Sequence, residues 1–90
     1  MAHTAREKEK ILSRINRMKG QLDAVAKALD GDRDCYEIMR LLASCRGAIN
    51  GLMGDVIEGH IRDHIVQAET KKDAAQSGEE IIEIMKSFWK

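Results

Sequence analysis

The chain has 90 residues, 15 basic and 15 acidic side chains, and one residue each of Trp, Tyr and Phe. This length predicts a single domain, residues 1–90, near the lower limit for one hydrophobic core. Proline is absent and a third of the residues are charged, which favours long helices and an all-α fold. The sequence shows neither an apolar run of roughly 18 residues nor a secretory signal, which predicts a cytoplasmic protein with no membrane partner.

The first predicted helix spans about residues 5–30. Thr4 followed by Glu7 has the spacing of a capping box at its start, and Gly31 stands where a C-cap is expected. Apolar positions alternate steps of four and three along this segment, which predicts one seam facing a partner helix. The seam consists of Ile11, Ile15, Met18, Leu22, Val25 and Leu29.

The second predicted helix begins near Asp32 to Asp34 and continues to about Gln67, and Asp34 forms a capping-box pair with Glu37. It carries two apolar stripes, so one neighbouring helix cannot cover it. One stripe contains Ile38, Leu42, Cys45, Ile49, Leu52 and Val56; the other contains Met39, Ala43, Met53, Ile57, Ile61 and Ile65. A second copy of the chain is the expected partner, and Cys45 is expected to be a buried hydrophobe.

Residues 68–77 are polar and predict a loop or a frayed helix end. A short third helix is expected over about residues 78–89, with Ser77 and Glu80 as its capping pair. The protomer is therefore predicted to be a long antiparallel helical hairpin with a short C-terminal helix.

His60 and His64 are four residues apart, a spacing that puts two imidazoles on one helix face. Solvated or core histidine pairs share this spacing, but a hairpin that turns near residue 31 also brings His3 to the same end. Cys35 lies about 37 Å from His60 along one straight helix. If two copies of the second helix cross antiparallel near residues 48 and 49, Cys35 of one chain lies level with both histidines of the other.

Such a cluster of one thiolate and two or three imidazoles suits late first-row metal ions rather than Mg²⁺ or Ca²⁺. If Met1 is removed, the Ala2 amine adds a further donor beside His3.

The N-terminal part of the chain is also basic, with seven Lys or Arg against three Asp or Glu in residues 1–29. Polar side chains follow one helical stripe there, which is either a solvated face or a surface for an anionic partner. They are Arg6, Lys10, Arg14, Arg17 and Gln21.

These features resemble the CsoR/RcnR family of bacterial metal-responsive repressors over essentially the full chain. The segments that carry the resemblance are MAHT, RINRMKGQLDA, the Cys35 region and RGAINGLMGDVIEGHIRDHI. The nickel/cobalt-responsive RcnR branch is the most similar, with a metal fingerprint that corresponds to His3, Cys35, His60 and His64. The resemblance implies an antiparallel four-helix-bundle-like dimer, a homotetramer built as a dimer of dimers, and a repressor that leaves operator DNA when Ni(II) or Co(II) binds. It also implies phosphate contacts along the polar stripe, with Lys8, Lys19 and Arg46 as additions.

Other functions compete with this hypothesis. A formaldehyde sensor of the same family would use Cys35 as a nucleophile, and a Zn(II)-binding variant or a metal carrier would use the same donors. The copper-sensing branch has Cys where this chain has His64, which argues against Cu(I). An enzyme or an organic cofactor is not expected, since the chain has no nucleophile–base constellation and no Gly-rich phosphate loop.

Overall fold

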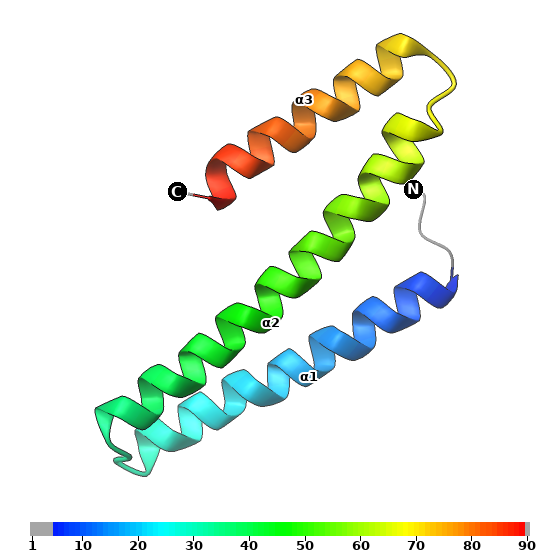
Figure 1. The fold of residues 1–90 in the computed structure, drawn as a ribbon. Coiled ribbons are helices and arrows are strands. Elements are labelled where there is room, and N and C mark those ends of the chain that lie inside the picture. Colours follow the sequence, from blue (N-terminus) through cyan, green and yellow to red (C-terminus); the bar gives the residue numbers. More distant parts are fainter. Residues whose placement is uncertain (1–4, 90) are drawn as a thin grey trace. The chain divides into compact units, whose positions relative to one another are not determined.

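A computed structural model describes residues 5–89 of the protein, which contain three α-helices, one π-helical turn and no strand. The elements are α1 (Ala5–Asp30), α2 (Cys35–Ile61), η1 (Arg62–Val66) and α3 (Lys71–Phe88) (Figure 1). The all-α, three-helix prediction is therefore confirmed. No helix within residues 5–89 is long and apolar enough to cross a membrane.

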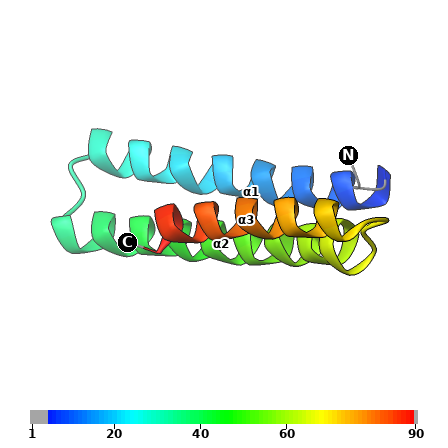
Figure 2. The same cartoon turned by 90° about the horizontal axis from the view of Figure 1, so that it is seen from above.

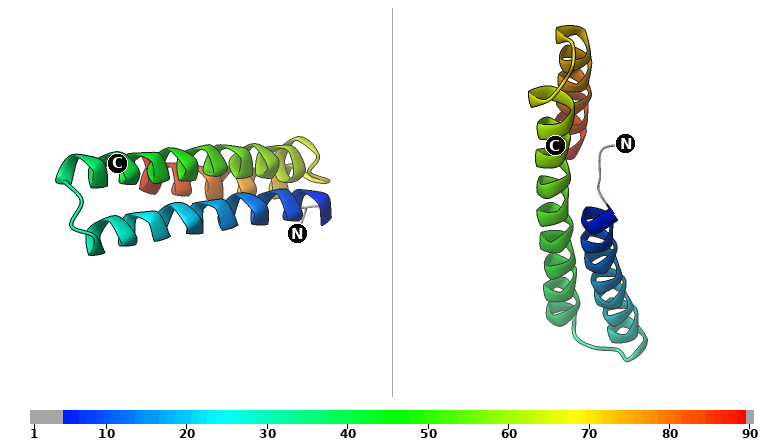
Figure 3. Two further views of the ribbon diagram at one scale, coloured as in Figure 1. Left: turned by 90° about the horizontal axis from the view of Figure 1, so that it is seen from below. Right: turned by 90° about the vertical axis from the view of Figure 1, so that its right-hand side faces the viewer.

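The chain forms two compact units, one ending at Met53 and the other beginning at Gly54. In the N-terminal unit, α1 and the first part of α2 lie side by side and antiparallel (Figure 1, Figure 2 and Figure 3). In the C-terminal unit, α3 packs on η1. The expectation of one domain over residues 1–90 stays a prediction.

The turn between α1 and α2 is a Schellman motif. Arg33 N–H donates to the Ala28 carbonyl (2.9 Å) and Asp32 N–H donates to the Leu29 carbonyl (3.2 Å). Gly31 is the C-cap, but the left-handed conformation falls on Asp32, with φ of 53°. Aspartate tolerates this region because its short polar side chain can bond locally to the backbone.

The start of α2 confirms the predicted capping residue, because Glu37 N–H donates to Asp34 Oδ1 at 2.8 Å. The predicted start of the third helix was wrong. α3 begins at Lys71, and its N-cap is Thr70, whose Oγ1 accepts from Asp73 N–H at 3.0 Å.

Residues 71–77 are therefore helical, although their polarity suggested a loop. Lys, Ala and Gln are good helix formers, and a capped start outweighs the lack of an apolar stripe in the first turns. The proposed cap between Thr4 and Glu7 involves a residue outside the described range.

The buried core within residues 5–89 consists of Val25, Ala28 and Cys45. Cys45 is only 4% exposed, which confirms its prediction as a small buried hydrophobe. Leu22 and Leu29 belonged to the predicted α1 seam but are 51% and 58% exposed. Gln21 and Ala28 take the places of these two leucines on the buried face of α1. The other four residues of the predicted seam are buried or half-buried, which confirms the seam in part: Ile11, Ile15, Met18 and Val25.

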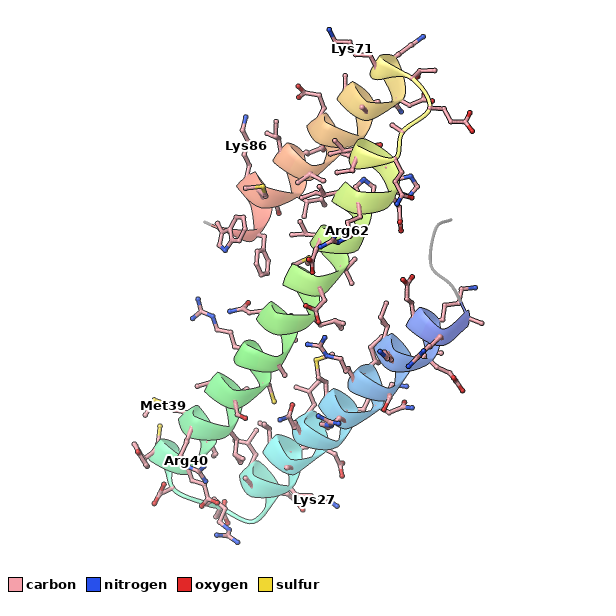
Figure 4. The ribbon with its side chains drawn as sticks, turned by 45° about the vertical axis from the view of Figure 1, so that its right-hand side comes forward. Lys27, Met39, Arg40, Arg62, Lys71 and Lys86 are labelled. Carbon is pink, nitrogen blue, oxygen red and sulfur yellow. The ribbon has the colours of Figure 1, made fainter. Side chains whose placement is uncertain are left out.

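Thirteen large hydrophobic side chains in residues 5–89 are exposed, against the three hydrophobic residues of the core. Met39, in the first turns of α2, is labelled in Figure 4. Full burial of one such side chain contributes about 1.5–3 kcal/mol, so this surface favours contact with another apolar surface. The exposed side chains are Leu12, Leu22, Leu29, Tyr36, Met39, Leu42, Ile49, Ile61, Val66, Ile82, Ile84, Met85 and Trp89.

Candidate functional site

The two histidines of the predicted metal pair lie against each other. His60 is in the last turn of α2 and His64 is in η1, and their ring centroids are 4.7 Å apart with an interplanar angle of 45°. Spacing on one helix face was the sequence-based reason to expect this pair. The two imidazoles are therefore close enough to present nitrogen donors to one ion.

His64 lies in a π-helical turn that the sequence pattern did not reveal. Gln67 N–H donates to the Arg62 carbonyl at 3.1 Å, a five-residue step that widens the helix at its end. Such turns are rare and occur often at functional sites. The predicted continuous helix to Gln67 is thus replaced by α2 followed by η1.

His60 carries a ring nitrogen without a hydrogen-bond partner among the described residues. This nitrogen, Nε2, is buried, and Glu80 Oε1 of α3 lies 3.9 Å from it, beyond hydrogen-bond range. An imidazole nitrogen that makes no hydrogen bond can act as a metal ligand in its neutral form. The donor chemistry of the two histidines therefore fits a transition-metal ion. The carboxylate of Glu80 lies close enough to His60 to influence this ligand.

Glu80 is a site residue that sequence reasoning missed, because it was assigned to the cap of a helix starting near Ser77. The signal that could have corrected this was Thr70 followed by Asp73, which has the spacing of a helix N-terminus. With α3 starting at Lys71, Glu80 lies within the helix and faces His60.

An open hollow of about 450 Å³ lies beside His64, between η1 and α3. Its lining contains four carboxylates and no Lys or Arg, so its charge favours cations over anions. The carboxylates belong to Asp63, Glu69, Asp73 and Glu80.

Of the five predicted metal donors, the described part of the chain brings together only His60 and His64. Cys35 is an exposed free thiol at the first residue of α2, whereas His60 comes near the last. His3 and Ala2 lie outside the described residues. Within residues 5–89, no group of three or more His, Cys, Asp or Glu is close enough to hold a metal ion.

The residues of the predicted DNA-binding stripe divide into two sets. Arg14 and Gln21 are half-buried, and they line a hollow with Ala48 of α2. The others expose their side chains: Arg6, Lys8, Lys10, Arg17, Lys19 and Arg46. Arg14 and Gln21, two members of the predicted stripe, are therefore near α2 and are not fully solvated.

The hollow on the N-terminal unit measures about 210 Å³ and is lined by Arg14, Arg17, Met18, Gln21 and Ala48. Gln21 Oε1 is buried and has no hydrogen-bond partner among the described residues. Two guanidinium groups beside one hollow suit an oxyanion, because each offers several donors in a planar arrangement.

Comparison with known proteins gives matches over most or all of the chain. A family described as metal-sensitive transcriptional repressor matches residues 7–87. The transcriptional repressor RcnR of Citrobacter koseri is 37% identical over 90 residues, and an uncharacterised protein in the bioA 5′ region of Serratia marcescens is 38% identical over 91 residues. Both alignments cover all of this chain and all of the relative.

Two solved structures share the fold. A histidine-for-glutamate variant of the formaldehyde-responsive regulator FrmR, from Salmonella enterica serovar Typhimurium, has a TM-score of 0.87 and 36% identity, covering 96% of this chain and 98% of its own. The copper-sensing repressor CsoR with Cu(I), from Geobacillus thermodenitrificans, has a TM-score of 0.91 and 26% identity, covering 100% and 94%. The chain therefore belongs to the family of metal-sensitive transcriptional repressors, which are regulators and not enzymes.

Proposed function

We propose that this protein is a cytoplasmic repressor that binds operator DNA without metal and releases it on binding Ni(II) or Co(II), which allows expression of metal-efflux genes. The observation that carries the proposal is the pair of imidazoles of His60 and His64, 4.7 Å apart, with the buried, unbonded Nε2 of His60. The similarity to the transcriptional repressor RcnR of Citrobacter koseri supports the repressor function.

The proposed ligands are His60 and His64 of one chain with Cys35 of a second chain. His3 and the Ala2 amine, once Met1 is removed, would complete a set of five donors. One thiolate with several nitrogen donors suits Ni(II) and Co(II), whereas Zn(II) usually takes four ligands in a tetrahedron. A Zn(II) sensor would therefore need only part of this set.

The proposed assembly is a homotetramer made of two dimers, with the α2 helices antiparallel in each dimer. Support comes from α2, where Leu42 and Ile49 are 47% and 46% exposed. They are seven residues apart and therefore share one face. We expect Ile49→Lys to dissociate the assembly, because a lysine charge at an apolar interface loses its hydration.

Sedimentation at micromolar concentration measures this effect. Ser44→Lys is the matched control, because Ser44 is exposed on α2 about 140° around the helix from Ile49 and gains the same charge. A wild-type protein that sediments as a monomer would contradict the assembly. Equal dissociation by both lysine variants would move the interface away from Ile49.

The proposed DNA surface includes Arg14 and Arg17, which line the same hollow. We expect Arg14→Ala and Arg17→Ala each to weaken operator binding and to lower the slope of log affinity against log salt by about one unit. Each substitution removes one phosphate contact, and fewer counterions are then released on binding. Metal affinity should stay close to the wild-type value.

Lys27→Ala provides the matched control for this prediction. Lys27 is also a basic residue of α1, but its Nζ lies 3.1 Å from Asp23 Oδ2, and both side chains are exposed. Its removal should leave the salt slope unchanged. If Arg14→Ala and Arg17→Ala behave like Lys27→Ala in electrophoretic shift assays across a salt series, the DNA surface lies elsewhere.

A formaldehyde sensor is the second candidate, favoured by the exposed Cys35 thiol and by the similarity to FrmR. A titration of operator binding against Ni²⁺, Co²⁺, Zn²⁺, Cu⁺ and formaldehyde in parallel separates the two functions. Release by Ni²⁺ or Co²⁺ at the lowest free concentration supports the proposal. Release by formaldehyde alone, with a methylene cross-link at Cys35 seen by mass spectrometry, would replace it.

A further inference from the structure

Gly51 of α2 lies opposite Arg14 of α1 in the N-terminal unit. A Cβ atom added at Gly51 would be 3.2 Å from Arg14 Nη2, tighter than ordinary van der Waals contact, so the guanidinium would have to shift by a few tenths of an ångström. A Cβ added at Gly47, one turn earlier on the same helix, would meet nothing within 4 Å. The missing side chain at Gly51 therefore leaves room that Arg14 uses.

Ala48 extends this small-residue surface toward the hollow. It is three residues before Gly51, so the two positions are neighbours on one helix face, and Ala48 forms part of the lining together with Arg14 and Arg17. Arg14, whose guanidinium lies beside Gly51, therefore also lines the hollow.

Close approach of the two helix backbones does not account for Gly51. The only atom within 4 Å of its added Cβ is the terminal nitrogen of Arg14, and no backbone atom of α1 is that near. Glycine is also less favourable than alanine in a helix interior, so the position gains nothing from helix propensity. Room for Arg14 is the feature that distinguishes Gly51 from Gly47.

We propose that Gly51 is a positioning residue for DNA binding, which leaves room for the Arg14 guanidinium against α2 so that Arg14 and Arg17 face one backbone phosphate at the hollow. This inference rests on the proposed function, because it assumes that Arg14 contacts operator DNA. Gly51 itself makes no contact with DNA.

The test measures operator affinity and its salt slope for Gly51→Ala, Gly51→Leu and the control Gly47→Ala. We expect Gly51→Ala to weaken binding about threefold and Gly51→Leu roughly tenfold, with a slope lower by about one unit for the leucine variant. Gly47→Ala should bind like the wild type. Thermal unfolding by circular dichroism should show Gly51→Ala at least as stable as the wild type, since alanine has the higher helix propensity.

The same glycine variants in an Arg14→Ala background separate positioning from a general structural effect. If Gly51 acts through Arg14, Gly51→Ala has no further effect on affinity once Arg14 is absent. Equal losses in both backgrounds, or identical behaviour of Gly51→Ala and Gly47→Ala, would overturn the inference while leaving the proposed function intact. An unchanged salt slope in Arg14→Ala alone would instead refute the DNA contact, and the positioning role with it.

Discussion

Replacing Cys35 or His64 by alanine is expected to lower Ni(II) and Co(II) affinity by about 100-fold or more and to abolish metal-induced release of DNA. Loss of a residue that only supports a ligand costs roughly 10–100-fold in metal affinity, so loss of a ligand itself should cost at least as much. Competition against a chromophoric chelator measures the affinity. Cys45→Ser is the control, because its thiol is buried in the core and outside the proposed site.

A mixture of the two variant proteins tests whether the site is shared between chains. Cys35 is the first residue of α2 and His64 follows the end of that helix, so a single α2 cannot bring them together. In a dimer of one Cys35→Ala chain and one His64→Ala chain, one site lacks both ligands and the other is intact. Metal binding should then recover at one site per mixed dimer.

Two controls give the mixing result its meaning. Each variant alone should show no recovery after the same unfolding and refolding treatment. A chain carrying both substitutions should not complement either single variant, because every site would lack Cys35 or His64. Complete absence of recovery in the mixture of single variants would contradict the shared site.

His3→Ala is expected to separate metal binding from the regulatory response. His3 and Ala2 lie outside the described residues, so this prediction rests on the donor set. In the proposed set, Cys35, His60 and His64 would hold an ion without the N-terminus, whereas six-coordinate Ni(II) or Co(II) would gain two further nitrogen donors from it. Because the N-terminus precedes the basic α1, its recruitment to the metal would bias the protein toward the DNA-free state.

The variant should therefore keep most of its metal affinity and lose much of its release from DNA at saturating Co²⁺ or Ni²⁺. An electrophoretic shift assay at saturating metal measures the release, and chelator competition measures the affinity. Arg6→Ala is a useful comparison, since it should weaken DNA binding without removing the metal response. Release of wild-type strength by His3→Ala for both metals would show that the N-terminus is not the switch.

Features that depend on local spacing could be predicted from the sequence. The bounds of α1 followed from its apolar repeat and the Gly31 stop, and the capped start of α2 followed from Asp34 and Glu37. The proximity of His60 and His64 followed from helical periodicity, and Cys45 was expected in the core from its place on an apolar stripe. Each of these depends on residues within a few helical turns of one another.

Other features depended on packing between elements that are distant in the sequence. The sequence pattern placed Leu22 and Leu29 in the α1 seam, but packing leaves both exposed and buries Ala28 instead. The nearness of Glu80 to His60 required the true start of α3, and the room that Gly51 leaves for Arg14 required the register of α1 against α2. A periodic pattern names the residues on a face, but only tertiary packing decides which atoms that face meets.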